Sequence, residues 1–166
     1  QDYGWLGWAK NGESAGTEGK SKRVEAIELK LIPKHANPPG STANRFVRSN
    51  AIKYKSYVRG LGWQKTAWEG SSSGTTGLGK KIESLNIELT SKQYDGGIEY
   101  RAHVQDLGWT SYVKDGANAG SPDSNKRLEA IEVRLYGDVT NYYDVYYRVH
   151  CQNVGWLDWG KNGEAV

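Results

Sequence analysis

The chain of 166 residues contains one cysteine, one phenylalanine, four prolines and no methionine. A single cysteine excludes an intrachain disulfide, and we expect Cys151 to be a small buried apolar side chain rather than a nucleophile. The absence of methionine, even at position 1, predicts a processed or excised piece of a longer protein. No window of the sequence shows the period of an amphipathic helix. These absences favour a disulfide-free domain made of β-strands.

Long hydrophobic runs and a strong net charge are missing too. No run approaches the roughly 18 apolar residues that a membrane span requires, and the first residues do not resemble a signal peptide. The formal net charge of +3 is too small to indicate binding to nucleic acid. We therefore expect neither a membrane nor a nucleic acid among the partners.

What the chain does contain is a recurring Gly-Trp pair, which begins at residues 4, 62, 108 and 155 and defines repeats one to four. In the first three repeats a glutamate lies twenty residues after the tryptophan. A repeat of this length exposes an apolar face that only a stacked neighbour can bury. We therefore expect residues 1–166 to form a single domain of internal repeats, with units at about 4–61, 62–107 and 108–154 and a partial fourth at 155–166.

Two segments of each repeat alternate apolar and polar residues, which is the pattern of a half-buried strand. The apolar positions of the first segment in repeat three are Ile98, Tyr100, Ala102 and Val104. The apolar positions of the second segment are Ile131, Val133 and Leu135 there, and Ile27, Leu29 and Leu31 in repeat one. Three copies of each strand predict an all-β assembly with three-fold pseudo-symmetry, like a β-prism or a β-trefoil. Closure of this kind removes exposed edge strands.

Glycines recur at two places in the polar segment between these strands. They are Gly12, Gly70 and Gly116, and then Gly16, Gly74 and Gly120. Glycine at a matching position in each repeat predicts a positive φ or a close approach of the backbone.

The tryptophan of each Gly-Trp pair is never replaced, so we expect it to be a core anchor. The second aromatic position is more variable and holds Trp8, Thr66, Tyr112 and Trp159. Its tolerance of a hydroxyl side chain indicates partial exposure, and a flat exposed ring suits stacking against a sugar. Trp68, two residues after Thr66, is expected to compensate for the missing ring.

Polar side chains follow these aromatic residues in three repeats. Amide and carboxylate groups beside an aromatic ring suit the hydroxyls of a sugar, which both donate and accept hydrogen bonds. The candidate ligand-binding residues are therefore Trp8, Asn11, Glu13, Trp68, Tyr112, Asp115, Asn118, Trp159, Asn162 and Glu164. The alternative is that the polar residues only make ordinary turns.

Catalysis has little support, because no nucleophile is placed by a motif near His103 or His150. Repetition gives several similar environments, whereas a catalytic site needs an acid and a base in unlike ones. We therefore expect no enzyme activity and no requirement for a metal or cofactor.

The order Gly108-Trp109, Gly116, Ala119-Gly120-Ser121 and Arg127-Leu128-Glu129-Ala130-Ile131-Glu132 resembles the clostridial hydrophobic-W (ChW) repeat of bacterial surface and secreted proteins. Repeat two departs from this pattern at Thr66, so a site there is expected to be weakened or lost. The resemblance implies an extracellular module that binds glycans, cell walls or partner proteins.

From these observations we expect a secreted or surface-attached, lectin-like module with one shallow aromatic site per repeat, binding glycans or cell-wall polysaccharide. Several weak sites on one chain gain avidity for a polymer. The alternative is a structural or adhesive module that binds protein partners or associates with itself through the partial fourth repeat.

Overall fold

The computed structural model describes residues 2–20, 22–43, 45–48, 51–90 and 93–166. The chain divides into two compact units, Gln1–Ser49 and Asn50–Val166, each described by itself. The described residues contain strands and one 3-10 turn, η1 (Asp138–Asn141), but no α-helix. The expected all-β class is therefore confirmed. Within the described part of the chain, no helix has the length and apolar character needed to cross a bilayer.

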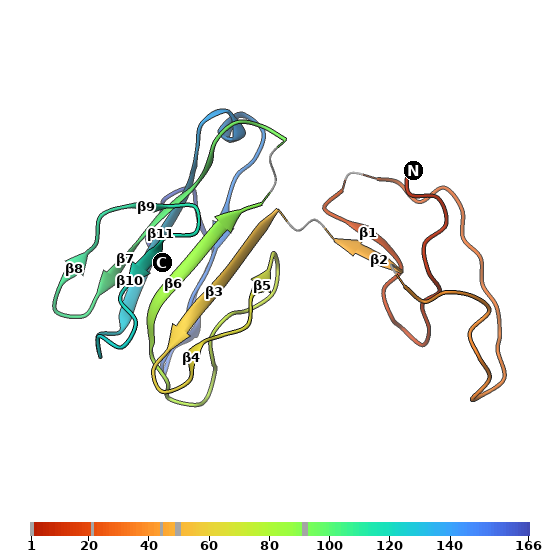
Figure 1. The fold of residues 1–166 in the computed structure, drawn as a ribbon, viewed down its shortest axis with the longest axis horizontal. Helices are drawn as coiled ribbons and strands as arrows, with labels where there is room; N and C mark the ends of the chain where they lie inside the picture. Colours follow the sequence, from red (N-terminus) through yellow and green to blue (C-terminus); the bar gives the residue numbers. More distant parts are fainter. Residues whose placement is uncertain (1, 21, 44, 49–50, 91–92) are drawn as a thin grey trace. The chain divides into compact units, whose positions relative to one another are not determined.

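Repeats two and three have the same strand plan, shown in Figure 1. A long strand pairs on one side with two short strands that follow it in the chain, and on the other with a second long strand. In repeat two these strands are β3 (Ile52–Val58), β4 (Gly62–Trp63), β5 (Ala67–Trp68) and β6 (Ile82–Leu89). In repeat three they are β7 (Gly97–Val104), β8 (Gly108–Trp109), β9 (Val113–Lys114) and β11 (Leu128–Tyr136).

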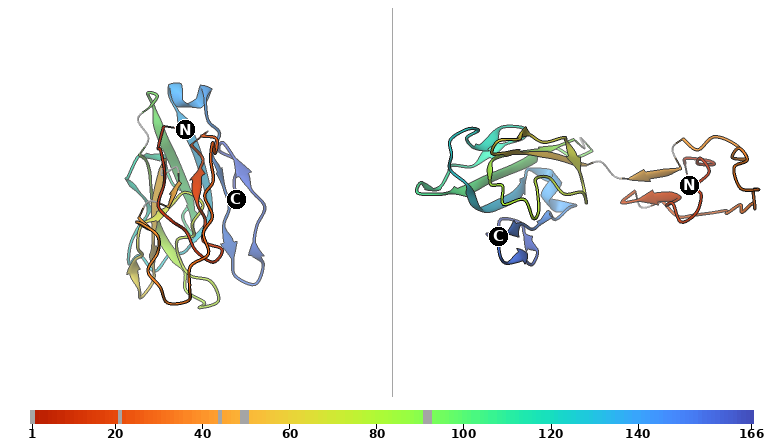
Figure 2. Two further views of the ribbon diagram at one scale, coloured as in Figure 1. Left: turned by 90° about the vertical axis from the view of Figure 1, so that its right-hand side faces the viewer. Right: turned by 90° about the horizontal axis from the view of Figure 1, so that it is seen from below.

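Repeat four continues the pattern with four short strands: β12 (Tyr146–Tyr147), β13 (His150–Cys151), β14 (Gly155–Trp156) and β15 (Gly160–Lys161). The first pairs with the last, and the middle two pair with each other. In the right-hand view of Figure 2 this deep blue segment lies on the side of the second unit away from the gold strand β3. Each structural repeat thus includes the long strand that comes before its Gly-Trp pair.

The core of the second unit lies where the alternating pattern predicts it. Ile98, Tyr100 and Ala102 of β7 are fully buried, and Val104 is nearly so. Ile87 and Leu89 of β6, Val133 of β11, and Val145 and Tyr147 of repeat four belong to the same buried cluster. Since alternate residues of a strand point to opposite faces, the charged residues between these positions lie on the outside of the sheets.

Successive repeats are joined by strand addition. The short strand β10 (Asn118–Gly120) of repeat three pairs antiparallel with β6 of repeat two. One repeat later, Val166 exchanges two backbone hydrogen bonds with Ile131 of β11, at 2.8 and 3.1 Å. Repeats three and four therefore each extend the sheet of the repeat before them. Closure into a three-fold prism or trefoil remains a prediction.

The buried Tyr100 hydroxyl reinforces one of these junctions. It accepts a hydrogen bond from the Ile87 amide of repeat two at 2.9 Å. It also donates one to the Ala117 carbonyl, just before β10. Burial raises the pKa of Tyr100 because the phenolate would lose its hydration.

In the first unit, β1 (Gly16–Glu18) pairs in parallel with β2 (Phe46–Arg48). The expected strand through Ile27, Leu29 and Leu31 is absent, and the Leu31 side chain is fully exposed. The prediction of a half-buried strand here is wrong. In repeats two and three the equivalent strand pairs with a long neighbour, and no such neighbour pairs with this segment among the described residues of the first unit.

The glycine prediction is confirmed at both aligned places. Gly116 has φ +82°, and Gly120 has φ +81°. At Gly120 an added Cβ would lie 2.3 Å from the Glu83 carbonyl oxygen, so the close approach of β10 to β6 excludes a side chain.

Candidate functional site

The outer faces of the sheets, meaning the sides turned away from the shared core, carry rows of aromatic and basic side chains. In repeat three the strand register places His103 opposite Trp109, and Arg101 opposite Glu132. Opposite residues in an antiparallel pair project to the same side. Tyr112, in the return segment between β8 and β9, joins this group through its contacts with Arg101 and Glu132.

Rings and guanidinium groups alternate along this face. Arg101 Cζ lies 4.8 Å from the ring centroids of both Trp109 and Tyr112. On Tyr112 a second guanidinium follows, with Arg134 Cζ at 4.1 Å from the ring centroid. These distances are within the range of cation–π attraction. The result is a ladder in the order Trp109, Arg101, Tyr112, Arg134.

Glu132 neutralises the centre of the ladder. Arg101 donates to its two carboxylate oxygens from Nε at 2.6 Å and from Nη2 at 3.1 Å. Tyr112 donates its hydroxyl to the same carboxylate at 2.5 Å. The pKa of Glu132 lies below its usual range, mainly because the hydrogen bonds from Arg101 favour the ionised carboxylate. The polar groups of this face are therefore largely satisfied by one another.

Repeat four contains the equivalent of the first three members of the ladder. Arg148 Cζ lies 4.9 Å from the Trp156 ring and 4.6 Å from the Trp159 ring. His150 meets the edge of Trp156 at 5.4 Å and 83°, and the His103–Trp109 pair has the same values. The geometry is thus reproduced one repeat later.

Repeat two keeps the tryptophan, but a lysine provides the cation. Lys55 Nζ lies 4.9 Å from the Trp63 ring centroid. Tyr57 meets the edge of the same indole, at 5.6 Å between centroids and 79° between planes. The first tryptophan of repeats two to four therefore has a cation on its face and another ring at its edge.

The expectation that the first tryptophan is a core anchor is wrong. Trp109 is 37% exposed and Trp156 is 45% exposed, while Trp5 is more exposed than either. The physical reason is the register, because in repeats two to four the tryptophan of the Gly-Trp strand lies opposite a polar-face residue of the strand before it. The sequence pattern places His103 on that polar face, but only the strand register places Trp109 opposite it.

The second aromatic positions differ in exposure. Trp159 is 57% exposed, Trp68 is exposed, and Trp8 and Tyr112 are half-buried. Trp68 lies opposite Lys53, so it shares the outer face of repeat two. The structure thus places the rings of repeats two to four on the outer faces, and their binding role remains a prediction.

The candidate Asp115 and Asn162 hold their own turns. Asp115 Oδ1 accepts from the Ile98 amide at 3.1 Å, and Oδ2 accepts from the Tyr136 hydroxyl at 2.8 Å. Asn162 Oδ1 accepts from the Val145 amide at 3.0 Å. Asp115 ties its segment to β7, and Asn162 ties its segment to the residue before β12, which is the ordinary-turn alternative considered from the sequence.

Three of the other four candidate polar residues also have partners within the chain. Glu13 accepts from the Lys10 amide at 3.1 Å, and Glu164 accepts from the Lys161 amide at 2.9 Å. The exposed Asn118 accepts from Asn86 Nδ2 at 3.2 Å. Asn11 is exposed and has a positive φ of 48°. A ligand role for these residues stays a prediction.

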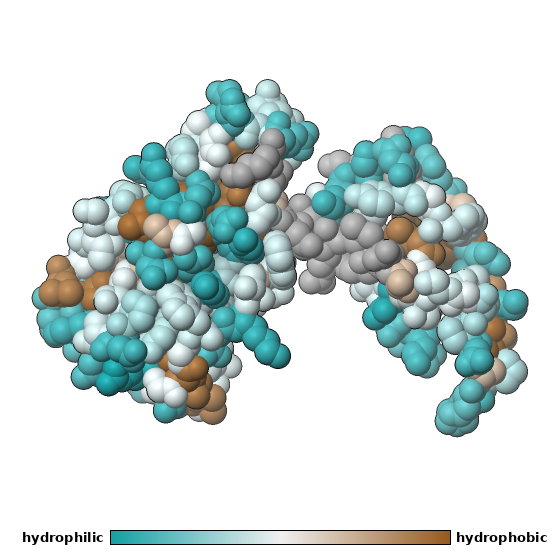
Figure 3. All heavy atoms as spheres, in the orientation of Figure 1, coloured by the Kyte–Doolittle hydropathy of each residue, from teal (hydrophilic) through white to brown (hydrophobic). Residues whose placement is uncertain are grey.

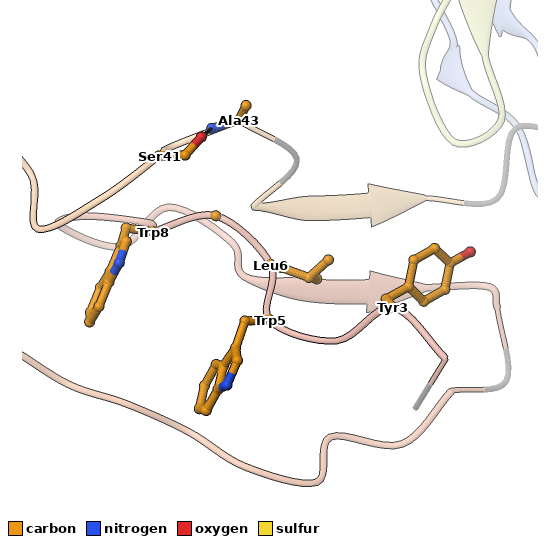
Figure 4. Close-up of a pocket in the computed structure, with 7 residues that line it drawn as sticks. Tyr3, Trp5, Leu6, Trp8, Ser41 and Ala43 are labelled. Carbon is orange, nitrogen blue, oxygen red and sulfur yellow. Dashed lines mark hydrogen bonds between the residues drawn. The ribbon is translucent and has the colours of Figure 1, made fainter.

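The first unit has an open depression of about 470 Å³. Figure 4 shows that the indoles of Trp5 and Trp8 both point to the same side of the segment that carries them. The lining residues are Tyr3, Trp5, Leu6, Gly7, Trp8, Ser41 and Ala43. The depression is open, and its wall is largely aromatic. Among the residues that the structure describes, no three His, Cys, Asp or Glu side chains gather as a metal site would require.

Comparison with known proteins identifies a family but no individual relative. A family model described as Clostridial hydrophobic W matches three segments, residues 1–33, 57–91 and 103–137. No curated protein and no solved structure matches the chain.

Proposed function

The chain belongs to the clostridial hydrophobic W family, whose repeats occur in bacterial surface and secreted proteins, and from this premise we propose that it is a carbohydrate-binding module. It binds glycans or cell-wall polysaccharide outside the cell through the outer faces of its repeats. The single observation that carries the proposal is the placement of the indoles on these faces, with Trp156 and Trp159 about half exposed beside Arg148.

A partly exposed indole presents a flat apolar surface with a negative π-cloud, against which the polarised C–H groups of a pyranose can lie. The stacked cation beside it holds the ring in place before a ligand arrives, so little rotamer entropy is lost on binding. Each site is shallow and therefore weak. Several faces in one chain raise the apparent affinity for a polymer that reaches more than one of them.

The test replaces Trp156 and Trp159 together with alanine. Binding to a glycan array, checked by competition with the free sugar, should fall at least about tenfold, equivalent to roughly 1.4 kcal/mol. Val154→Ala is the matched control, because Val154 is exposed at the adjacent turn but offers no ring. A urea titration verifies that both variants are folded. Undiminished binding by the tryptophan variant would refute the role of this face.

A second function, adhesion to a protein or to another copy, is favoured by a different observation. The residue before each Gly-Trp pair is exposed and apolar: Tyr3, Leu61, Leu107 and Val154. Figure 3 shows hydrophobic surface over β4 and β8, next to these turns. Exposed apolar side chains at hairpin tips suit contact with another protein surface. If the chain is adhesive in this way, Leu61→Ser combined with Leu107→Ser should abolish any self-association seen by sedimentation and leave glycan binding unchanged.

A further inference from the structure

The slot at the centre of the repeat-three ladder is filled by the chain itself. The Tyr112 ring contacts two guanidiniums, and Glu132 occupies the charge-binding positions of Arg101. We propose that repeat two presents the corresponding slot open, with the Lys53–Glu88 ion pair in place of Arg134, and that it binds a sugar unit carrying a carboxylate or a phosphate. This inference rests on the proposed glycan-binding function and names the ligand class of one site.

The two repeats can be compared residue by residue, because their strands share one register. Lys55 lies opposite Asn86 in the pairing of β3 with β6. Arg101 lies opposite Glu132 in the pairing of β7 with β11. A shift of 46 residues relates these pairs, and it also relates Thr66 to Tyr112. Repeat two therefore lacks both side chains that fill the slot in repeat three.

Lys55, the cation of repeat two, has no carboxylate partner among the residues that the structure describes. Lys55 Nζ lies over the Trp63 ring at 4.9 Å, and within the described ranges no carboxylate forms an ion pair with it. Its cross-strand neighbour Asn86 is neutral. The nearby Lys53 is already paired with Glu88 at 2.9 Å. An anion that reaches Lys55 would gain a charge-assisted hydrogen bond without breaking an existing ion pair.

Repeat two has no ring at the position of Tyr112. Thr66 is exposed and provides a hydroxyl where repeat three has the phenol of Tyr112. A pyranose ring is about as large as the phenol that it would replace. Trp63 on one side and the exposed Trp68 on the same face offer apolar surfaces for its C–H groups. The ligand ring thus takes the place of the Tyr112 ring, and its acidic group takes the place of the Glu132 carboxylate.

The loss of an aromatic ring at Thr66 is expected, from the sequence alone, to weaken a site in repeat two. The structure favours the opposite effect, because in repeat three Tyr112 and Glu132 already occupy Arg101, whereas Lys55 of repeat two has neither neighbour. A neutral sugar would use only the apolar surfaces of repeat two. An acidic one would also use Lys55, so the site discriminates by charge, and added salt weakens its binding.

The experiment measures binding of tetragalacturonate by isothermal calorimetry at low salt, with its fully methyl-esterified form as the neutral match. The acidic form should bind the wild-type chain at least about tenfold more tightly. A glycerol phosphate tetramer, run in parallel, shows whether phosphate serves as well as carboxylate. Lys55→Ala should remove the preference for acidic probes. Lys65→Ala removes an exposed lysine next to Thr66 and should leave the preference for acidic probes unchanged.

Two reciprocal variants test the slot itself. Thr66→Tyr with Asn86→Glu rebuilds the filled arrangement in repeat two and should abolish acidic-probe binding. Tyr112→Thr with Glu132→Asn opens repeat three and should add a second acidic-probe site. Equal binding of both galacturonate forms, or full binding by the filled variant, overturns the inference. If glycans still bind and depend on Trp156 and Trp159, the proposed function stands while this inference fails; if no glycan binds, both fail.

Discussion

Tyr100→Phe removes one hydroxyl from a ring that is completely buried between repeats two and three. The ring keeps its packing, so the change isolates two hydrogen bonds. The Ile87 amide loses its acceptor at 2.9 Å, and the Ala117 carbonyl loses its donor. Both groups belong to the junction at which β10 extends the sheet of β6.

The expected loss follows from the partners left behind. A typical hydrogen bond contributes about 1 kcal/mol net, and a buried amide without an acceptor costs about 1–3 kcal/mol. We therefore expect the free energy of unfolding to fall by roughly 2–3 kcal/mol. With a urea m-value of about 1–3 kcal/mol/M, the unfolding midpoint should drop by roughly 1 M.

Tyr54→Phe is the matched control one repeat earlier. Tyr54 donates to the Ser71 carbonyl, the equivalent of Ala117, but it is only half-buried and its hydroxyl accepts no hydrogen bond from another described residue. Its removal should cost about 1 kcal/mol or less. The assay is urea unfolding followed by circular dichroism. Equal losses in the two variants would refute the claim that the Ile87 bond stabilises the junction.

Two further predictions concern the outer face and the strand junction. Glu132 has a pKa lowered by Arg101, so its contribution is complete above the unfolded pKa of about 4.3 and is lost as the pH falls through the lower folded value. Glu132→Gln should therefore destabilise the chain by about 1–2 kcal/mol at pH 7 and by much less near pH 2, and a urea midpoint gap that is constant with pH would contradict this. Gly120→Ala should lower the free energy of unfolding by more than about 2 kcal/mol. The new Cβ clashes with the Glu83 carbonyl, and the positive φ is unfavourable for alanine. Gly108→Ala, at φ +76° with open space around it, should cost only about 1 kcal/mol, and equal thermal shifts for the two would contradict the clash.

The repeat pattern was sufficient to predict the class of fold and the inward residues of repeats two and three. Alternation in β7 correctly separated Ile98, Tyr100 and Ala102 from the charged residues between them. This succeeds because the two faces of a pleated strand meet different solvents, and the sequence carries that difference directly. The positive φ of the aligned glycines could also be predicted from the sequence, since a positive φ restricts the choice of residue locally.

The orientation of the tryptophans required three dimensions. An unreplaced Trp after glycine is compatible with either side of the sheet, and the cross-strand partner His103 places Trp109 outside. The same holds for Tyr112, whose phenol is held by Glu132 from a strand twenty residues away in sequence. Neither partner is adjacent in the chain, so no local pattern reports the contact.

Equivalent residues with the same alternating pattern are buried in one repeat and exposed in another. Leu29 and Leu31 alternate as Ile87 and Leu89 do, yet the first pair is exposed and the second pair is buried. The alternating pattern of a segment indicates which of its side chains favour burial. Whether they are buried depends on a partner strand that satisfies the backbone and covers the apolar face, and that partner comes from elsewhere in the chain.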